Sequence, residues 1–348
     1  MACYNQSMPQ EVSTLLGRVS GGGHLSLEEM SAAIDAIMRG EWSDDEIGLL
    51  LTALAAKGET VDEVAGAALA MRHHMTPIRS RRAEVLDTCG TGGGGSKMFN
   101  VSTTAAIVAA AAGVPVAKHG NRSVTSCSGS ADVLAELGVN INANAAQVEA
   151  CLNELGICFC FAPLMHPSMK HVAAVRKRLG IRTIFNILGP LVNPAGARYQ
   201  LLGAGRPELR PLLAGAMARL GTKRTLVVSG EDGLGDVTLA GITNVTEVTA
   251  AGTREFTWQP EDFGLERSSL DSLSVDGPQA SAAIIRGVLA GQHGRARDIV
   301  ILNAAAGLIA AGLTTDPKSA ATVAAAAIDS CAAETLLKRL AEESYATI

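Results

Sequence analysis

A run of glycines followed by hydroxyl and amide side chains is the first stretch that could do chemistry. In "DTCGTGGGGSKMFNVSTT", residues 87–104, glycines stand at 90 and at 92–95, and a helix is predicted to begin near Ser102 or Thr103. Backbone without side chains lets N–H groups approach phosphate oxygens, and a helix start adds a favourable dipole. The stretch lacks the G-K-[ST] of a P-loop and the G-x-G-x-x-G spacing of a dinucleotide site. It therefore predicts a phosphate-binding loop of another kind, with a flexible glycine turn as the alternative.

A second loop rich in hydrogen-bond donors follows in "AKHGNRSVTSCSGSADVL", residues 117–134. Lys118 and Arg122 supply positive charge, which suits phosphate as a point charge and as a planar fork respectively. Gly120 and Gly129 allow the backbone to close around a ligand. The alternative is a solvated loop capped by Ser130 at the start of the next helix, but two such loops so close together favour a phosphate site.

The third stretch, residues 161–194, gives a weaker signal. His166 precedes a proline at a predicted helix start, and Arg176 lies nearly three helical turns further on. A lone histidine is more often structural than catalytic, and the basic residues 176–178 read equally well as a solvated helix face. Pro190 and Pro194 predict a rigid turn after this helix.

The elements that position these loops alternate between strands and helices from residue 85 onward. Short apolar runs at "EVLDTCG", "GVPVAKHG", "GICFCFAP", "YQLLGAG" and "RTLVVSG" predict strands. Helices are predicted at 103–112, 130–137, 145–155, 206–220 and 316–341. This alternation indicates a mostly parallel sheet flanked by helices, and in such sheets ligands bind beyond the carboxyl ends of the strands. The loops described above begin where strands end, which predicts one composite site.

The first eighty residues predict helices only. Three capping boxes, Ser26/Glu29, Ser43/Glu46 and Thr60/Glu63, each place a hydroxyl three residues before a glutamate. Such short helices bury little alone, so we expect a small bundle that packs against something else. Residues 76–84 are polar and basic and are interpreted as a hinge. We predict a helical domain at 1–80, joined by about 168–195, and an α/β domain at 81–348.

Composition excludes several classes of protein. The chain has 348 residues, of which 47% are hydrophobic and 18% charged, as in globular proteins. The net charge of −5 argues against a general nucleic-acid or membrane-surface binder. No segment reaches the roughly 18 apolar residues of a membrane span, and residues 1–10 do not read as a signal peptide. Seven cysteines without a C-x-x-C pair predict free thiols and a cytoplasmic location.

Taken together, the motifs resemble those of the anthranilate phosphoribosyltransferases over nearly the whole chain. The stretches that carry the resemblance are "GTGG" (90–93), "FNVST" (99–103), "KHGNRSVTS" (118–126), "SGSADVL" (128–134) and "RTIFNILGPLVNP" (182–194). The resemblance implies transfer of a phosphoribosyl group from phosphoribosyl pyrophosphate to the amine of anthranilate, with release of pyrophosphate, in tryptophan biosynthesis. It also implies Mg²⁺ as cofactor and a homodimer formed through the N-terminal helices.

The resemblance assigns roles to matching positions. Binding of the phosphoribosyl donor is implied for Gly90, Gly93, Gly94, Met98, Asn100, Val101, Ser102, Thr103, Lys118, Ser126 and Ser130. Binding of anthranilate is implied for Gly90, His119, Asn121, His166, Arg176 and Pro190, with Arg176 facing the carboxylate. Ser102 and Asp236 are the implied magnesium ligands. No residue is assigned as general acid or base, because an arylamine attacking the anomeric carbon needs little help from a base.

The sequence departs from the family's pattern around the metal. Gly94 stands where the family usually has an aspartate, Met98 where it has a threonine, and Gly235-Asp236 where it has an adjacent Asp-Glu pair. Since Mg²⁺ keeps several waters, these changes predict weaker metal binding in a working enzyme. On this basis Gly235→Asp is expected to lower the magnesium requirement.

Two alternatives remain open from the sequence. One is a transferase or nucleoside phosphorylase of the same fold that acts on another acceptor. The other is a non-catalytic relative that binds nucleotide or nucleic acid after its metal site has decayed. The acidic net charge and the presence of Lys118, Asn121 and Arg176 argue against the second.

Overall fold

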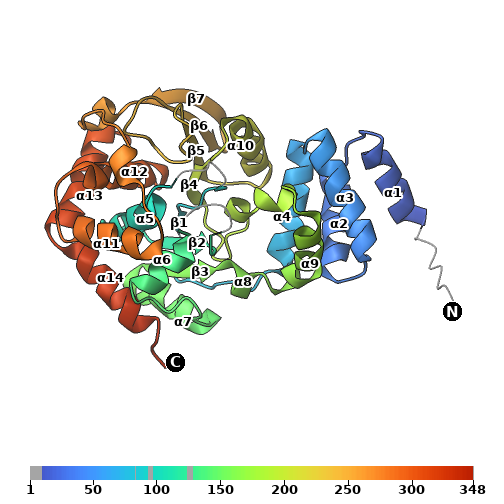
Figure 1. Cartoon of the computed structure of the whole chain (residues 1–348), viewed down its shortest axis with the longest axis horizontal. Helices are drawn as coiled ribbons and strands as arrows, with labels where there is room; N and C mark the ends of the chain where they lie inside the picture. The colour runs from blue at the N-terminus through green and yellow to red at the C-terminus, as the bar shows by residue number, and fades with distance from the viewer. Residues whose placement is uncertain (1–9, 83, 93–96, 124–127, 348) are drawn as a thin grey trace.

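The computed structural model describes residues 10–82, 84–92, 97–123 and 128–347 (Figure 1). The chain begins with four helices, α1 (Gln10–Ser20), α2 (Leu27–Met38), α3 (Asp44–Lys57) and α4 (Val61–His74). All three predicted capping boxes are present, at the first turns of α2, α3 and α4. Each satisfies backbone N–H groups that a helix start otherwise leaves unpaired. The apolar side chains spaced behind these caps, such as Met30, Ile34 and Leu50, are fully buried.

A seven-stranded sheet forms the centre of the rest of the described chain. Its strands are β1 (Leu86–Asp87), β2 (Val116–Gly120), β3 (Ile157–Phe161), β4 (Tyr199–Gly203), β5 (Arg224–Gly230), β6 (Thr243–Thr249) and β7 (Gly252–Trp258). Their order in the sheet is β3-β2-β1-β4-β5-β6-β7. Strands β1 to β5 pair in parallel, whereas β6 and β7 are antiparallel. The predicted mostly parallel sheet is confirmed, and the five strands predicted from sequence are all present.

One face of the sheet carries the larger hydrophobic core. It is covered by α5 (Val101–Ala111), α6 (Ser130–Glu136), α11 (Pro278–Leu289), α12 (Arg295–Ala310), α13 (Pro317–Asp329) and α14 (Ala332–Glu343). The sheet contributes alternate residues to this core, including Leu226 and Val228 of β5. The helix predicted over 316–341 is in fact two, because Cys331 adopts a left-handed conformation with φ of 59° between them.

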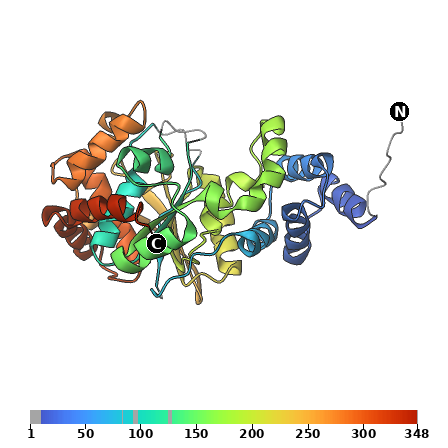
Figure 2. The same ribbon diagram turned by 90° about the horizontal axis from the view of Figure 1, so that it is seen from below.

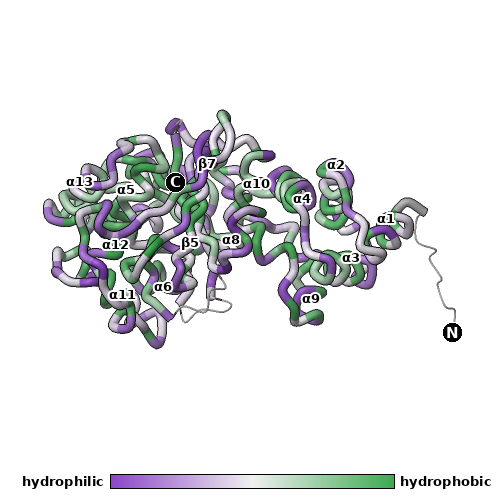
Figure 3. Tube along the Cα trace, turned by 90° about the horizontal axis from the view of Figure 1, so that it is seen from above, coloured by the Kyte–Doolittle hydropathy of each residue, from purple (hydrophilic) through white to green (hydrophobic). Residues whose placement is uncertain are grey.

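The opposite face of β4 and β5 joins the helical bundle in a second core. Val227, which lies between Leu226 and Val228, packs there with α10 (Arg210–Arg219), whose other side contacts α4. The contact between α10 and α4 is close, since a Cβ on Gly215 would lie 2.6 Å from a Val61 methyl carbon. Helix α10 therefore stands between the sheet and the bundle. Hydropathy colouring shows green stretches both at α5 and at α2, in the two cores (Figure 3).

The chain between β3 and β4 leaves the sheet, reaches the bundle and returns. After β3 come the single-turn α8 (Ala162–Met165) and α9 (Lys170–Leu179), and α9 packs on α2 and α3. Figure 2 shows this segment extending from the sheet toward the bundle helices. Residues 184–191 then form short 3₁₀ turns before β4 begins. The predicted bundle thus has a definite partner within the same chain, α10 together with this excursion.

The strand order places a topological switch point between β1 and β4. From β1 the chain proceeds to β2 on one side, while β4 and β5 lie on the other. Loops that leave the carboxyl ends of these strands diverge and open a crevice, which is where parallel sheets bind ligands. Among the described residues, no single helix is long and apolar enough to cross a membrane, although α13 and α14, bent by 63°, meet the length and composition criteria together.

Candidate active site

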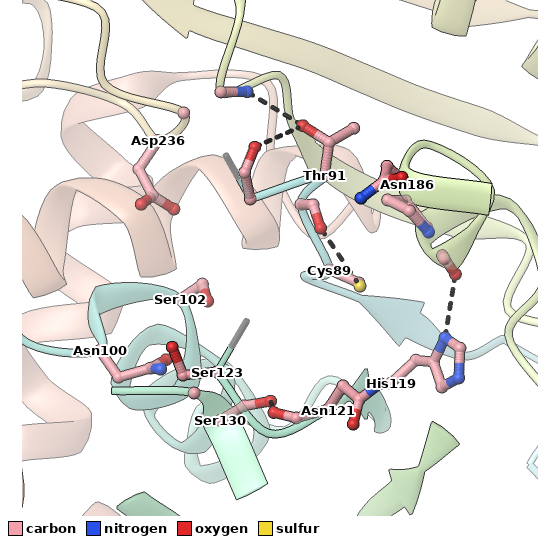
Figure 4. A pocket seen from close by; sticks show the side chains of 18 of the residues that line it. Cys89, Thr91, Asn100, Ser102, His119, Asn121, Ser123, Ser130, Asn186 and Asp236 are labelled. Atoms are coloured by element: carbon pink, nitrogen blue, oxygen red, sulfur yellow. Dashed lines mark hydrogen bonds between the residues drawn. The ribbon is translucent and has the colours of Figure 1, made fainter. Parts of the chain in front are cut away.

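A pocket of about 430 Å³ opens at this switch point (Figure 4). Its walls are the loops after β1, β2, β4 and β5, together with the start of α5 and the turns at 184–190. Predicted donor residues among its described lining are Gly90, Met98, Asn100, Val101, Ser102, Lys118 and Ser130. Predicted anthranilate residues in the lining are Gly90, His119, Asn121, Arg176 and Pro190, and Asp236 lines it too. Gly93, Gly94 and Ser126 lie outside the described residues.

The start of α5 presents the Ser102 hydroxyl to the pocket, while the backbone N–H groups of Asn100, Val101 and Thr103 donate to the Ser281 hydroxyl, the Phe99 carbonyl and the Asn100 side chain. The helix begins at Val101, slightly earlier than predicted, because Asn100 caps it. The Asn100 Oδ1 atom accepts hydrogen bonds from the backbone N–H and the hydroxyl of Thr103, at 3.2 and 2.6 Å. Thr103 is therefore buried beneath the cap and is absent from the pocket lining, while Ser102 faces it. A helix start of this kind favours anionic ligands.

Lys118 is a buried ammonium group at the end of β2. Its Nζ lies 3.4 Å from both the backbone carbonyl and the hydroxyl of Thr88. The Asp87 carboxylate below it is fully buried, and its Oδ1 accepts the His119 backbone N–H at 3.2 Å. Burial raises the pKa of Asp87 to about 6, and the charge of Lys118 opposes that rise. The Lys118 ammonium group thus lies on the pocket side of this pair, and the Asp87 carboxylate lies beneath it.

The loop after β2 winds tightly because two positions carry no side chain. A Cβ on Gly120 would overlap the Ser130 hydroxyl, and one on Gly129 would overlap the Ser123 amide. Asp132 fixes the loop by accepting the backbone N–H groups of Ser123 and Gly129, at 2.9 and 3.1 Å. The sequence motif contains Asp132, but no role was predicted for it. Asp132 could have been recognised in the sequence, because a carboxylate at the third position of a helix can accept hydrogen bonds from N–H groups of the preceding loop.

The two predicted histidines form a pair, and only one of them reaches the pocket. His119 lines it, whereas His166 lies behind His119 and is not among the lining residues. The His119 Nδ1–H donates to the Gly189 carbonyl at 2.9 Å, and the two Nε2 atoms are 3.3 Å apart. Burial lowers the pKa of His119 to about 3 and that of His166 to about 4, so both rings are neutral near pH 7. His166 contacts His119 without lining the pocket, and its contact with anthranilate stays a prediction.

Arg176 brings a guanidinium to the end of the pocket opposite α5. It lies over the ring of Phe185, 5.6 Å from the centroid, and burial lowers its pKa without removing its charge. Arg182 and Asn186 line the same end, and sequence reasoning missed both. Arg182 precedes the 3₁₀ turn at 184–186 and Asn186 ends it. Such irregular segments follow no periodic pattern, so only the polarity of these residues within an apolar stretch could have marked them.

Asp236 provides a carboxylate on the side of the pocket that carries Ser102. Figure 4 shows both side chains directed into the same space. Burial raises the pKa of Asp236 to about 7, and the positive charge of Lys118 opposes the rise. The adjacent Val237 is held from both sides by buried Asn303 of α12, which accepts its N–H at 2.9 Å and donates to its carbonyl at 2.8 Å. Asn303, a lone amide in an apolar helix, was also missed from sequence.

These oxygen atoms fit one magnesium ion that shares its coordination with a phosphorylated substrate. Mg²⁺ takes oxygen ligands, keeps several waters and is held by one or two carboxylates plus phosphates. No cluster of three or more His, Cys, Asp or Glu side chains with metal-binding geometry occurs in the described part of the chain. Asp236 is the one carboxylate among the described lining residues, and the Ser102 hydroxyl is the predicted second ligand beside it.

Four glycines bring the loops after β1, β4 and β5 into backbone contact. A Cβ on Gly235 would lie 2.9 Å from Gly205 Cα and 3.0 Å from Gly205 N. One on Gly90 would lie 2.8 Å from the Gly203 carbonyl oxygen, and one on Gly203 would overlap the Gly235 carbonyl. Thr91 ties the first two loops further, donating its N–H to the Gly203 carbonyl at 2.9 Å and accepting the Gly205 N–H at 3.1 Å. Position 235 thus has no room for the carboxylate side chain of the family pattern described above unless backbone moves.

Comparisons with known proteins agree with this geometry. The α/β domain of the glycosyl transferase family matches residues 82–334, and the helical bundle domain of the same family matches residues 13–75. The chain is 48% identical to the anthranilate phosphoribosyltransferase of Rhodopirellula baltica over 330 residues, covering 95% of this chain and 96% of that protein.

Solved structures give the same result. The crystal structure of the anthranilate phosphoribosyltransferase from Thermus thermophilus superposes with a TM-score of 0.89 at 43% identity, covering 95% of this chain and 99% of that one. The Saccharomyces cerevisiae enzyme in complex with PRPP and Mg gives 0.88 at 29% identity, covering 96% and 97%. With both domains matched and the pocket built from the motifs that carried the resemblance, the chain belongs to the anthranilate phosphoribosyltransferase family.

Proposed function

We infer that this protein transfers the phosphoribosyl group of phosphoribosyl pyrophosphate to the amine of anthranilate, giving N-(5-phosphoribosyl)anthranilate and pyrophosphate in tryptophan biosynthesis. The observation that carries this inference is the division of one pocket into two ends. Asn100, Ser102 and Asp236 lie on one side of the pocket and Asn186 and His119 on the other (Figure 4), and Arg176 and Pro190 of the same excursion as Asn186 also line it. Membership of the family, established over 95% of the chain, supports the same reaction.

The donor end would bind the phosphates and orient the anomeric carbon. Lys118 and the positive end of the α5 dipole would face the phosphates, and Ser102 and Asp236 would hold Mg²⁺. When bound, the ion supplies charge neutralisation to the departing pyrophosphate. We propose the donor contacts for the predicted residues that line the pocket, with Thr103 acting beneath the Asn100 cap.

The acceptor end would fix anthranilate by its carboxylate and by its amine. Arg176 is the cation that a benzoate group would meet there, and its position over Phe185 keeps the guanidinium plane steady. His119 offers a neutral ring held by Gly189, and Asn121 lies beside it in the lining. The arylamine is already uncharged near neutral pH and loses its proton after the new C–N bond forms, so positioning is the chief task.

Further expectations complete the proposal. We propose a helical domain at 1–80 joined by about 168–195, supported by the packing of α9 on α2 and α3, and an α/β domain at 81–348. We propose a homodimer through the N-terminal helices, supported by the exposed Leu49 of α3. A cytoplasmic location is supported by five described cysteines, 89, 151, 158, 160 and 331, that are free thiols.

The test is direct. Purified protein is mixed with anthranilate, phosphoribosyl pyrophosphate and millimolar MgCl₂, and loss of anthranilate fluorescence is followed with time. We expect turnover that stops when the donor or the metal is omitted. Absence of turnover under these conditions, or faster phosphorolysis of a nucleoside with inorganic phosphate, contradicts the proposed function.

A further inference from the structure

The charges that line the pocket are unequal. Asp236 is the one carboxylate among its described lining residues, whereas the cations there are Lys118, Arg122, Arg176, Arg182 and Arg206. Pyrophosphate carries several negative charges, and a magnesium ion held by one carboxylate neutralises only part of them. Protein cations must therefore supply more of the neutralisation at the donor end.

Most of these cations have other positions or partners. Arg176 and Arg182 belong to the acceptor end, on the excursion between β3 and β4. Arg122 donates to Asp132 at 3.1 Å and lies 5.9 Å from the centre of the Phe161 ring. Lys118 lines the floor of the pocket, where it is buried beside Thr88. Arg206 is left, in the loop that follows β4, and sequence reasoning gave it no role.

The backbone places Arg206 at the phosphate end. Its neighbour Gly205 donates its N–H to Thr91 of the glycine loop, at 3.1 Å. The same Gly205 touches Gly235, whose neighbour is Asp236. Arg206 is therefore one residue from the contact that joins the phosphate loop to the loop of the proposed metal ligand. Gly205 backbone leaves no room for a carboxylate side chain at position 235. The described part of this pocket wall therefore carries one carboxylate, Asp236, together with the guanidinium of Arg206.

The Arg206 side chain lines the pocket, and its ion-pair partner is exposed. It forms an ion pair with Glu208, at 3.6 Å, and Glu208 is largely exposed. The Arg206 side chain itself is 37% exposed. Glu59, in the loop between α3 and α4, is the other nearby acid: burial raises its pKa and the charge of Arg206 opposes the rise. Exposed ion pairs of this kind contribute little stability, so a bound polyanion outcompetes them.

We propose that Arg206 binds the pyrophosphate of the donor and holds it as it leaves. Its positive charge would supply part of the neutralisation that a metal site with more carboxylate ligands would otherwise supply. The inference rests on the proposed function. A guanidinium matches two phosphate oxygens with parallel N–H donors and stays protonated throughout. When the C1–O bond breaks, the electron pair remains on the pyrophosphate oxygen, where the fixed positive charge stabilises it.

The test measures binding of inorganic pyrophosphate by titration calorimetry, first in EDTA and then in millimolar MgCl₂. Arg206→Gln removes the charge, Arg206→Lys keeps it without the fork, and Arg198→Gln removes an exposed arginine next to the opposite, amino-terminal end of β4. We expect Arg206→Gln to weaken binding about tenfold or more in EDTA, with a smaller loss at high magnesium, as for a charged hydrogen bond. Arg206→Lys should lose less, and Arg198→Gln should bind as the unchanged protein does.

The outcomes separate the two proposals. If the unchanged protein binds pyrophosphate in neither condition, the proposed function itself fails. If it binds but Arg206→Gln binds equally well in both conditions, or if Arg198→Gln loses as much, the role of Arg206 is overturned. A urea unfolding curve for each variant shows whether any loss of binding comes from loss of fold, and only variants with an unchanged midpoint are compared.

Discussion

Arg176 is the residue on which recognition of the acceptor is expected to depend. Its guanidinium lies over Phe185 at the acceptor end of the pocket. We predict that Arg176→Gln raises the KM for anthranilate about 10- to 100-fold, as expected for loss of a charged hydrogen bond, with little change in the KM for phosphoribosyl pyrophosphate. Steady-state kinetics with each substrate varied in turn measures both constants.

Arg178 provides the control on the same helix. It is exposed and pairs with Asp44 and Asp45 of α3, away from the pocket. Arg178→Gln should leave both KM values unchanged. An equal rise in both KM values for Arg176→Gln would contradict the assignment, because it would indicate a general distortion of the site.

Asp87 makes stability depend on pH. Its carboxyl group holds a proton up to about pH 6 in the folded chain, whereas the same group ionises near 3.8 when unfolded. The favourable contribution of the protonated group is thus complete below pH 4 and is lost as the pH rises through 6. We predict that the unfolding free energy of Asp87→Asn, relative to the unchanged protein, rises by up to about 3 kcal/mol between pH 4 and 7, at 1.36 kcal/mol for each pKa unit.

Urea unfolding at a series of pH values measures this difference. Asp276→Asn, which removes a carboxyl group at an exposed position, is the control. A flat difference for Asp87→Asn would show that the buried carboxylate is ionised at no cost.

At this scale the sequence predicted those residues that belong to contiguous motifs. Lys118, His119 and Asn121 share one short loop, and their chemistry can be read without knowing the fold. Arg206 and Asn303 could not be found this way, because their roles arise from contacts between loops and helices far apart in the chain. The burial of His166 against His119 could not be predicted either, since it depends on the packing of the excursion and not on local sequence.

Among elements, the contact between the loops after β4 and β5 is expected to tolerate no side chain. We predict that Gly235→Ala lowers the unfolding free energy by about 1–3 kcal/mol, the usual cost of overpacking, because the new Cβ meets Gly205 backbone. It should also raise the magnesium concentration needed for half-maximal rate, since Asp236 moves with the loop. Urea unfolding and a magnesium titration measure the two effects.

Gly241 offers a matched control in the same loop region, because nothing lies within 4 Å of a Cβ added there. Gly241→Ala should change neither quantity. Equal stability of Gly235→Ala and the unchanged protein would show that the loop adapts freely. The same conflict applies to Gly235→Asp, so the lower magnesium requirement expected from sequence is reached there only if the backbone at 204–205 shifts.

Helices and strands with a clear hydrophobic period or a helix N-cap could be predicted from sequence. Strands whose place depends on pairing with another strand could not. The three capping boxes are local signals, and each one marks a helix start. Strands β6 and β7 were missed because β7 is largely exposed and mixes polar with apolar residues, and its place is fixed by antiparallel pairing with β6. The break between α13 and α14 was missed because a cysteine in left-handed conformation gives no warning in the sequence.

For the molecule as a whole, the proposed homodimer makes a simple prediction. Leu49 of α3 is 52% exposed, and Leu313, after α12, is 50% exposed. If the N-terminal helices form the interface, Leu49→Arg should shift the protein from dimer toward monomer, because a buried unpaired charge is costly. Light scattering coupled to gel filtration measures the mass.

Leu313→Arg is the control of equal exposure and should leave the mass at that of the unchanged protein. A monomeric unchanged protein, or a dimer that Leu49→Arg leaves intact, contradicts an interface at α3. The fold class itself followed from the alternation of strands and helices. The packing of α10 between the sheet and the bundle did not, since no local pattern states which helix covers which face.

The excursion between β3 and β4 is one continuous segment that carries several of the proposed anthranilate-binding residues, so it can be exchanged as a unit. It contributes His166, Arg176 and Pro190 as one continuous piece, while the donor loops come from separate strand ends. Both ends of the piece are anchored in the same sheet, at β3 and at β4. Exchanging residues 162–198 as a single cassette is therefore the economical way to give this scaffold a new acceptor while its phosphoribosyl chemistry stays in place.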